Sequence, residues 1–197
     1  PELAAAALAA TVEREGLGMF RFSEAARGLR ERLAYLHEQL GDPWPDVESA
    51  DPQTWLGPEL EGVARGASIS RVDMYPALQR LLPWPEATRL AELAPERLLV
   101  PSGSRHRVDY ATGRPVVSVK LQECFGLDAS PELAGKPVLF HLLSPAGRPL
   151  AVTDDLASFW SGPYAQVRAE MRGRYPKHPW PEDPWTAPAT ARTKKRM

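Results

Sequence analysis

The 197-residue chain has little of what several protein classes require. Its single cysteine, Cys124, cannot form an intrachain disulfide, which favours a reducing compartment such as the cytoplasm. No apolar run approaches the ~20 residues needed to span a bilayer, so no transmembrane helix is expected. The net charge is −1, so the chain as a whole lacks the positive excess typical of proteins that bind nucleic acid or membranes. These absences predict a cytoplasmic globular protein with no membrane partner.

Motifs that carry chemistry are also missing. The sequence contains no Gly-x-x-x-x-Gly-Lys-Ser/Thr phosphate-binding loop, no Gly-x-Gly-x-x-Gly fingerprint and no His-Glu-x-x-His zinc motif. Ser102-Gly103-Ser104 lacks the second glycine of a nucleophile elbow and is typical of a turn. The four histidines are scattered, and one cysteine cannot complete a zinc site with them. We therefore expect no catalytic, cofactor or metal site in this chain.

Residues 1–95 are predicted to form a helical region of short helices joined by proline turns. Ser23 is placed to cap a helix that ends before Gly41. The apolar stripe of this helix consists of Leu29, Leu33, Leu36 and Leu40. Asp51-Pro52 predicts the start of a shorter helix that stops at Gly57-Pro58, and Asp73 predicts the cap of another.

Residues 96–184 are predicted to form a small β-sheet with packed helices, because the apolar period changes from about 3.6 to 2 after Pro95. Residues 105–110 alternate, which places Arg105, Arg107 and Asp109 on one face of a strand. Residues 138–143 are apolar on both faces and predict a central strand.

The two helices that follow are predicted from their ends. Thr153 is expected to cap the first helix, and Gly173 is expected to end the second. The expected fold class is α+β: an N-terminal short-helix region packed with a small, mainly antiparallel sheet, C-terminal helices and a proline-rich extended strap.

The strap, residues 173–184, holds four prolines in twelve residues, and that density excludes a helix or a central strand. Its rings, Tyr175, His178 and Trp180, lie between prolines and are therefore presented stiffly. Two interpretations stay open at this point. The strap either packs across its own domain or presents rings and cations to a partner.

Cations gather toward the C-terminus. From Arg168 to Met197 there are eight cations and three acids, so this part carries +5 and the preceding part carries −6. Residues 185–197 have no apolar pattern and predict a basic disordered tail. Cations interleaved with rings are typical of single-stranded nucleic acid binding. The candidate contacts besides the tail cations are Arg105, Arg107, Arg172, Arg174 and Lys177, with Tyr175 or Trp180 as a stacking ring.

Nine strings in order carry a family resemblance. They are residues 32–36 (RLAYL), 41–46 (GDPWPD), 81–84 (LLPW), 93–95 (LAP), 100–105 (VPSGSR), 121–126 (LQECFG), 141–149 (HLLSPAGRP), 155–160 (DLASFW) and 174–184 (RYPKHPWPEDP). With them the chain resembles the C-terminal region of HrpB-type bacterial ATP-dependent helicases, of the DEAH/RHA class. The resemblance covers nearly the whole chain from about Gly16 onward.

The resemblance implies a parent protein whose two RecA-like motor domains bind ATP and Mg²⁺. None of the motor motifs is present in this sequence, so no catalytic or ATP-binding residue transfers to it. The partners it implies are the motor domains of the same parent chain, with single-stranded RNA or DNA as a further partner, and the expected state is monomeric.

Two functions remain open from the sequence. The first is an accessory C-terminal domain of an ATP-dependent RNA or DNA helicase that contributes nucleic-acid contacts. The second is a protein-interaction or scaffold module that braces the motor without binding nucleic acid, in which the strap is an internal clamp.

Overall fold

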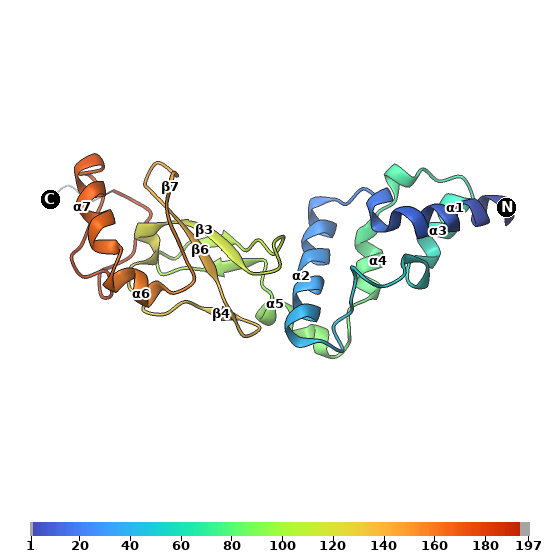
Figure 1. The fold of residues 1–197 in the computed structure, drawn as a ribbon, viewed down its shortest axis with the longest axis horizontal. Coiled ribbons are helices and arrows are strands. Elements are labelled where there is room, and N and C mark those ends of the chain that lie inside the picture. Colours follow the sequence, from blue (N-terminus) through green and yellow to red (C-terminus); the bar gives the residue numbers. More distant parts are fainter. Residues whose placement is uncertain (1, 194–197) are drawn as a thin grey trace. The chain divides into compact units, whose positions relative to one another are not determined.

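The computed structural model describes residues 2–193 and divides the chain into two compact units. Unit 1 extends to Leu90 and unit 2 begins at Ala91. The sequence analysis predicts this boundary slightly later, between residues 95 and 96. Unit 1 is helical and unit 2 holds all the strands of the described residues, so the predicted α+β class is confirmed (Figure 1). Within residues 2–193, no helix combines the length and apolar character that crossing a bilayer demands.

Unit 1 consists of helices, and some of them begin at a side-chain cap. Its elements are α1 (Glu2–Glu15), η1 (Gly16–Met19), α2 (Glu24–Leu40), η2 (Pro52–Thr54), α3 (Gly57–Ala64), η3 (Ile69–Arg71), α4 (Met74–Arg80), η4 (Glu86–Arg89) and the start of α5 (Leu90–Leu93). The Ser23 hydroxyl accepts a hydrogen bond from the Ala26 amide at 3.1 Å, and the Asp73 carboxylate accepts one from the Tyr75 amide at 3.0 Å. Both predicted caps are confirmed.

The predicted helix between Asp51-Pro52 and Gly57-Pro58 is wrong in extent. Asp51 caps only the three-residue 3₁₀ helix η2, and Gly57-Pro58 begins α3 instead of ending the earlier helix. Proline lacks an N–H, but the first turn of a helix leaves its N–H groups without intrahelical partners. Pro58 therefore fits the start of a helix better than its end.

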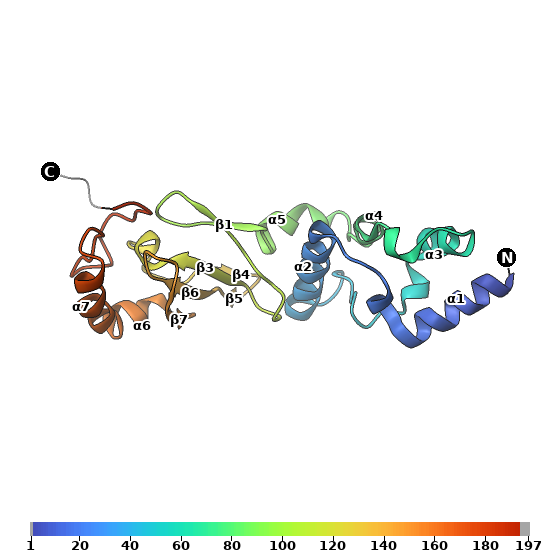
Figure 2. The same cartoon turned by 90° about the horizontal axis from the view of Figure 1, so that it is seen from above.

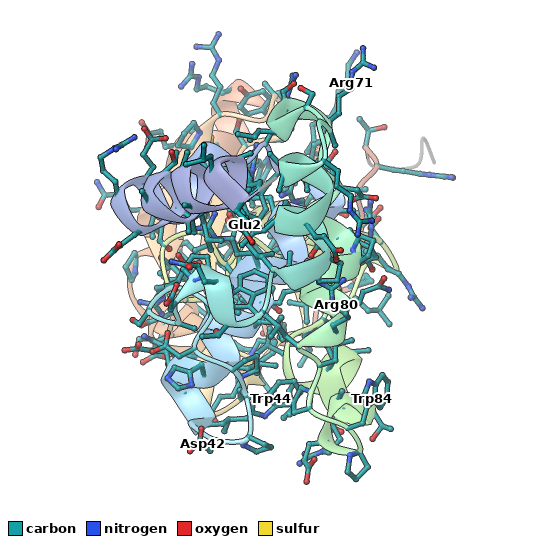
Figure 3. The ribbon with its side chains drawn as sticks, turned by 90° about the vertical axis from the view of Figure 1, so that its right-hand side faces the viewer. Glu2, Asp42, Trp44, Arg71, Arg80 and Trp84 are labelled. Carbon is teal, nitrogen blue, oxygen red and sulfur yellow. The ribbon has the colours of Figure 1, made fainter. Side chains whose placement is uncertain are left out.

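Helix α2 supplies the centre of the unit 1 core. Leu29, Leu33 and Leu36 are buried, whereas Leu40, at the end of the predicted stripe, is 44% exposed. Nδ1 of His37, in the last turn of α2, lies 2.8 Å from the carbonyl oxygen of Trp44. This contact holds the turn that follows the helix against α2. Figure 3 shows Trp84 directed outward, and its side chain is 66% exposed.

Unit 2 contains three small sheets and two C-terminal helices. Its elements are β1 (Arg97–Leu99), β2 (Arg105–Arg107), β3 (Val116–Lys120), η5 (Leu121–Cys124), β4 (Glu132–Leu133), β5 (Lys136–Pro137), β6 (Leu139–Leu143), β7 (Pro149–Thr153), α6 (Leu156–Ser161) and α7 (Tyr164–Arg174). Strand β6 is central, as predicted, and pairs parallel with β3 and antiparallel with β7. Strands β1 and β2 form a separate antiparallel ribbon, as Figure 2 shows.

The core of unit 2 joins this mixed sheet to α6 and α7, which lie at one end of it in both views (Figures 1 and 2). Phe140 and Leu142 of β6 are fully buried. At the end of the sheet near the helices, the rings of Phe125, Trp160 and Tyr164 pack with centroid separations of 5.4–6.0 Å. Tilted and edge-to-face pairs of this kind are favourable beyond the area they bury.

Two predicted helix ends need correction. The cap of α6 is Asp155, whose carboxylate accepts from the Ser158 amide at 3.1 Å. Thr153 instead accepts from the Asp155 amide and orients the cap. Gly173 does not end α7, because the helix continues through it to Arg174, and the Tyr175 amide closes the last turn on the Met171 carbonyl at 2.8 Å.

Candidate nucleic-acid interface

The strap after α7 packs on its own unit. Trp180 is 6% exposed, and its indole N–H donates to the Tyr175 carbonyl at 2.9 Å. Nε of Arg168 in α7 donates to the Trp180 carbonyl at 2.7 Å. The Tyr164 hydroxyl, from the aromatic cluster, donates to the Pro181 carbonyl at 2.6 Å. The backbone of the strap is therefore fastened to α7, and the Trp180 side chain bonds to the first turn of the strap itself.

The far end of the strap reaches the turn after η5. The Gly126 amide donates to the Pro184 carbonyl at 2.8 Å. Gly126 has a φ of +87°, a left-handed conformation that glycine adopts without strain, so glycine permits this turn. The strap clamps α7 to this turn.

This packing corrects the role expected of Trp180. A stacking ring must offer its face to a base, whereas both the ring and the N–H of Trp180 are used within unit 2. Trp180 is an anchor of the strap. Tyr175 is half-buried and meets His178 edge to face at a centroid distance of 6.2 Å.

Three of the expected cations, Arg172, Arg174 and Lys177, lie exposed at the end of α7 and the start of the strap. The two arginines occupy the last turn of the helix, where a positive charge complements the helix dipole. Burial and the charge of Lys120 lower the pKa of His178, so this imidazole favours its neutral form. The end of α7 is therefore cationic, and part of that charge has a structural explanation.

The other expected cations lie on the β1–β2 ribbon. Its register pairs Arg97 with Arg107, Leu98 with His106 and Leu99 with Arg105. Because side chains alternate along a strand, Leu98 and His106 turn toward unit 2 and are half-buried. The exposed face carries Arg97, Leu99, Arg105 and Arg107. The sequence analysis did not name Arg97 as a candidate. The alternation of residues 105–110 shows which side chains share a face of one strand, but not which residue of the neighbouring strand lies opposite Arg107.

A buried carboxylate fixes the tip of this ribbon. Glu123 of η5 is 3% exposed; its Oε1 accepts from the Ser102 hydroxyl at 2.8 Å and lies 3.2 Å from Nε2 of His106. The Ser102 amide also donates to the Glu123 carbonyl at 3.2 Å. Burial alone would raise the pKa of Glu123, but the hydrogen bonds from Ser102 and His106 outweigh it and hold the pKa below its ordinary value.

This serine, histidine and glutamate do not form a hydrolase triad. In a triad the histidine stands between the nucleophile and the acid and removes the proton of the hydroxyl. Here the Ser102 hydroxyl donates directly to Glu123, and His106 contacts the same oxygen. The cluster therefore holds the hairpin in place, and His106 does not occupy the position of a triad histidine.

The chain after the strap returns to η5. The Thr190 amide donates to the Gln122 carbonyl at 3.2 Å, and Nε2 of Gln122 donates to the Arg192 carbonyl at 3.1 Å. Residues 187–193, which were expected to be disordered, therefore include a segment held on unit 2, while Lys194, Lys195 and Arg196 lie outside the described residues. Adjacent residues of η5, Gln122 and Glu123, thus hold the start of the tail and the tip of the ribbon.

Comparison with known proteins defines the class. A family described as ATP-dependent helicase C-terminal (HrpB C-terminal) matches residues 55–184. The ATP-dependent RNA helicase HrpB of Escherichia coli K12 is 40% identical in an alignment 192 residues long, which covers 93% of this chain and 24% of that protein. This chain spans about a quarter of its relative's length.

Two solved structures agree with that match. The crystal structure of the E. coli DExH-box NTPase HrpB superposes with a TM-score of 0.79 at 41% identity, covering 92% of this chain and 24% of that one. A crystal structure of the E. coli DEAH/RHA helicase HrpB superposes with a TM-score of 0.66 at 37% identity. That match covers 87% of this chain and 23% of the other. The class is thus a C-terminal region of an ATP-dependent helicase. The chain belongs to the HrpB C-terminal family, which confirms the resemblance.

Proposed function

We propose that this chain is an accessory, non-catalytic region of an ATP-dependent RNA helicase and that unit 2 adds contacts to single-stranded RNA. The family and the RNA helicase name of the E. coli relative support the substrate class. Helicases need contacts that follow the displaced strand, and cationic surfaces provide them through the phosphates. A cytoplasmic location, beside the motor domains of the same chain, belongs to this proposal.

The separation of charge between the units carries the proposal. Residues 1–90 contain nine basic and fourteen acidic residues, a net charge of −5, whereas residues 91–197 contain fifteen and eleven, a net charge of +4. Exposed cations of unit 2 lie on the β1–β2 ribbon and at the end of α7. A net positive charge on one unit and a net negative charge on the other are expected to direct a polyanion to unit 2.

ATP and Mg²⁺ belong to the motor in this proposal, because the residues of this chain do not fit them. The sequence contains no phosphate-binding loop. Among residues 2–193, no three histidine, cysteine or acidic side chains come together as metal ligands would. Unit 1 has a cavity of about 470 Å³, but it is lined by the Arg30–Glu48 ion pair and by turn residues such as Asp51.

The test compares the full helicase with a version that ends before this region. RNA-stimulated ATP hydrolysis and affinity for a fluorescent single-stranded oligonucleotide are measured over a salt series. The deletion is expected to weaken RNA binding and to flatten its salt dependence, because fewer phosphates are neutralised. Equal affinity and equal salt slope in the two proteins would contradict the proposal.

A bracing role is the second candidate, and the buried strap favours it. The contacts of Trp180 and Tyr164 make the strap an internal clamp. Unit 1 also exposes apolar side chains, including Trp84 at 66%. If bracing is the function, the deletion lowers the melting temperature of the motor domains and leaves RNA affinity unchanged.

A further inference from the structure

Three cations gather where α7 ends and the strap begins. Arg172, Arg174 and Lys177 are exposed, and none of them forms an ion pair with a residue in the described part of the chain. Arg168 on the same helix differs, because its Nε donates to the Trp180 carbonyl at 2.7 Å. The fold therefore holds Arg168 against the strap and leaves the three later cations available to a ligand.

The helix dipole explains only part of this charge. Arg172 and Arg174 lie in the last turn of α7, where a positive charge is favourable, but the effect fades beyond that turn and Lys177 already belongs to the strap. Lys120, at the end of β3, is half-buried and has no ion pair with a described residue. Burial, and then the charge of Lys120, lower the pKa of His178. Two lysines therefore add positive charge that the helix does not account for.

The turn that carries these side chains is rigid. The Tyr175 amide donates to the Met171 carbonyl at 2.8 Å and closes α7. The Tyr175 carbonyl accepts from the His178 amide at 3.1 Å and from the indole N–H of Trp180 at 2.9 Å. Because both backbone groups of Tyr175 are already bonded, a ligand that binds at this turn has little backbone to order and loses little entropy in doing so.

Tyr175 differs from the other tyrosines of unit 2. The hydroxyls of Tyr110 and Tyr164 donate to backbone carbonyls at 2.7 and 2.6 Å, and both residues are buried. Tyr175 is half-buried, and its hydroxyl forms no hydrogen bond with a residue between 2 and 193. It meets His178 edge to face, a contact that uses at most one face of either ring. The Tyr175 ring is therefore suited to stack on a base.

Cations around such a ring indicate a polyanion that carries flat apolar groups. Guanidinium groups present planar donors that match phosphate oxygens. Residues 170–178 contain three cations and one acid, Glu170, so the local charge stays positive. Single-stranded RNA offers phosphates together with unstacked bases, whereas a double helix hides the faces of its bases. The combination of charge and ring at this turn therefore favours a single strand.

We propose that the turn at the end of α7, formed by Arg172, Arg174, Tyr175 and Lys177, is the surface of unit 2 that contacts single-stranded RNA. The cations bind phosphates and the Tyr175 ring stacks on a base. This inference rests on the proposed function and names its site. The β1–β2 ribbon also carries exposed arginines, but its outer face has no aromatic ring.

The experiment uses the full helicase carrying R172E/R174E/K177E. Affinity for a fluorescein-labelled oligouridine is measured by anisotropy from low to moderate salt. The variant is expected to bind about tenfold more weakly at low salt, and the slope of log affinity against log salt should fall by about 2, since each lost single-strand phosphate contact contributes roughly 0.7. R172K/R174K keeps the charges and should retain most of the affinity. Unchanged affinity and slope in the triple variant overturn the site.

Matched variants separate this site from other causes. R21E/R27E/R71E makes the same charge change on exposed arginines of unit 1 and should leave RNA affinity unchanged. An equal loss in this control would mean that net charge alone governs binding, and it overturns the site. Lys177→Glu lies outside the helix, so it should weaken RNA binding about threefold with no change in melting temperature. If the triple variant binds normally while deletion of the region weakens binding, the site is wrong and the proposed function stands. If neither change weakens binding, both fail.

The ring has its own test. Tyr175→Ala should weaken binding about tenfold with an unchanged salt slope, because stacking releases no counterions. Tyr175→Phe keeps the ring and should bind like the wild type, and equal losses in the two variants would contradict stacking. With 4-thiouridine RNA and peptide mapping by mass spectrometry, the crosslinks in this region are expected to include Tyr175. Crosslinks confined to residues 97–107 would assign the contact to the β1–β2 ribbon and overturn the inference.

Discussion

Arginines join segments of the fold in both units, but unit 2 also places exposed arginines together on the β1–β2 ribbon. In unit 1, Arg30 pairs with Glu48 at 2.7 Å and Arg80 of α4 pairs with Glu59 of α3 at 2.6 Å. These contacts join segments of the helical unit, so the cations are part of the fold. In unit 2, Arg114 pairs with Asp154 at 3.1 Å in the same way. Arg97 and Arg105, by contrast, are exposed and form no ion pair with a described residue. The net charge of a unit therefore gains meaning when the cations that pair inside the fold are separated from those that stay exposed.

The units also differ in how their cores are closed. Unit 1 is organised on α2, a continuous helix with a local cap at Ser23. The core of unit 2 is closed by the strap, which follows α7 and contacts Tyr164 and Gly126. The first unit is thus built around one capped helix, and the second is completed by a segment that comes late in the chain. The following variants separate the two, from the largest expected effect to the smallest.

The largest effect is expected for Trp180→Ala. Removing a buried tryptophan leaves a cavity and opens the strap, so unit 2 should lose about 3–5 kcal/mol of unfolding free energy. Hydrogen exchange should rise across α7 and the strap and stay unchanged in unit 1. The matched variant Trp84→Ala, at a 66% exposed position, should cost less than about 0.5 kcal/mol. Similar losses in both variants would mean that the strap is not a clamp.

Leu33→Ala makes the reverse comparison. Leu33 is fully buried in α2, so the variant should destabilise unit 1 by about 2–4 kcal/mol, and denaturant unfolding monitored by circular dichroism measures the loss. Leu40→Ala, on the same stripe but 44% exposed, is the control and should cost less than about 1 kcal/mol. If Leu33→Ala also raised exchange in the strap, the two units would not be independent.

Acid should destabilise unit 2 through Glu123. Its pKa in the folded chain lies below the ordinary value of 4.5, so the unfolded chain takes up the proton first as the pH falls. The stabilisation is therefore complete above the ordinary pKa and is lost as the pH drops through the folded value. Glu123→Gln should cost about 1–3 kcal/mol at neutral pH and make unit 2 less sensitive to acid. An unchanged acid profile would remove Glu123 as the cause.

The smallest effect is expected for Arg65→Ala in unit 1. Arg65 pairs with Glu61 one helical turn away, and both side chains are largely exposed. Pairs of this kind contribute about 0.3–0.5 kcal/mol and are screened by salt. Thermal unfolding at two salt concentrations measures the loss, and a loss above about 1 kcal/mol would show that this pair does more than join two turns of one helix.

Sequence reasoning succeeded where the deciding contact is local. The caps Ser23 and Asp73 bond to amides two or three residues away, so their side chains identify them. The central strand β6 was predicted because burial on both faces leaves a continuous apolar run. Pro58 was misplaced because a proline after glycine is compatible with both the end and the start of a helix.

The candidate site was only partly predictable. Arg105 and Arg107 were predicted from the alternation along one strand. Predicting Arg97 requires the pairing register of two strands joined by a turn, and the periodicity of the sequence does not contain that register. The role of Trp180 was ambiguous because an indole between prolines is equally suited to burial or to stacking. Only its hydrogen bonds with Tyr175 and Arg168 in the folded chain decide for burial. Glu123 gave no signal, since its partners lie 17 and 21 residues away.

The strap has a consequence for synthesis. The ribosome makes the aromatic cluster of Phe125, Trp160 and Tyr164 before it makes Trp180 and Pro181. Until Pro181 and Pro184 have been made, the Tyr164 hydroxyl and the Gly126 amide lack their partners in the strap, and Trp180 is absent from the core of unit 2. Unit 1 can therefore be complete while unit 2 still exposes apolar surface of the kind that chaperones bind.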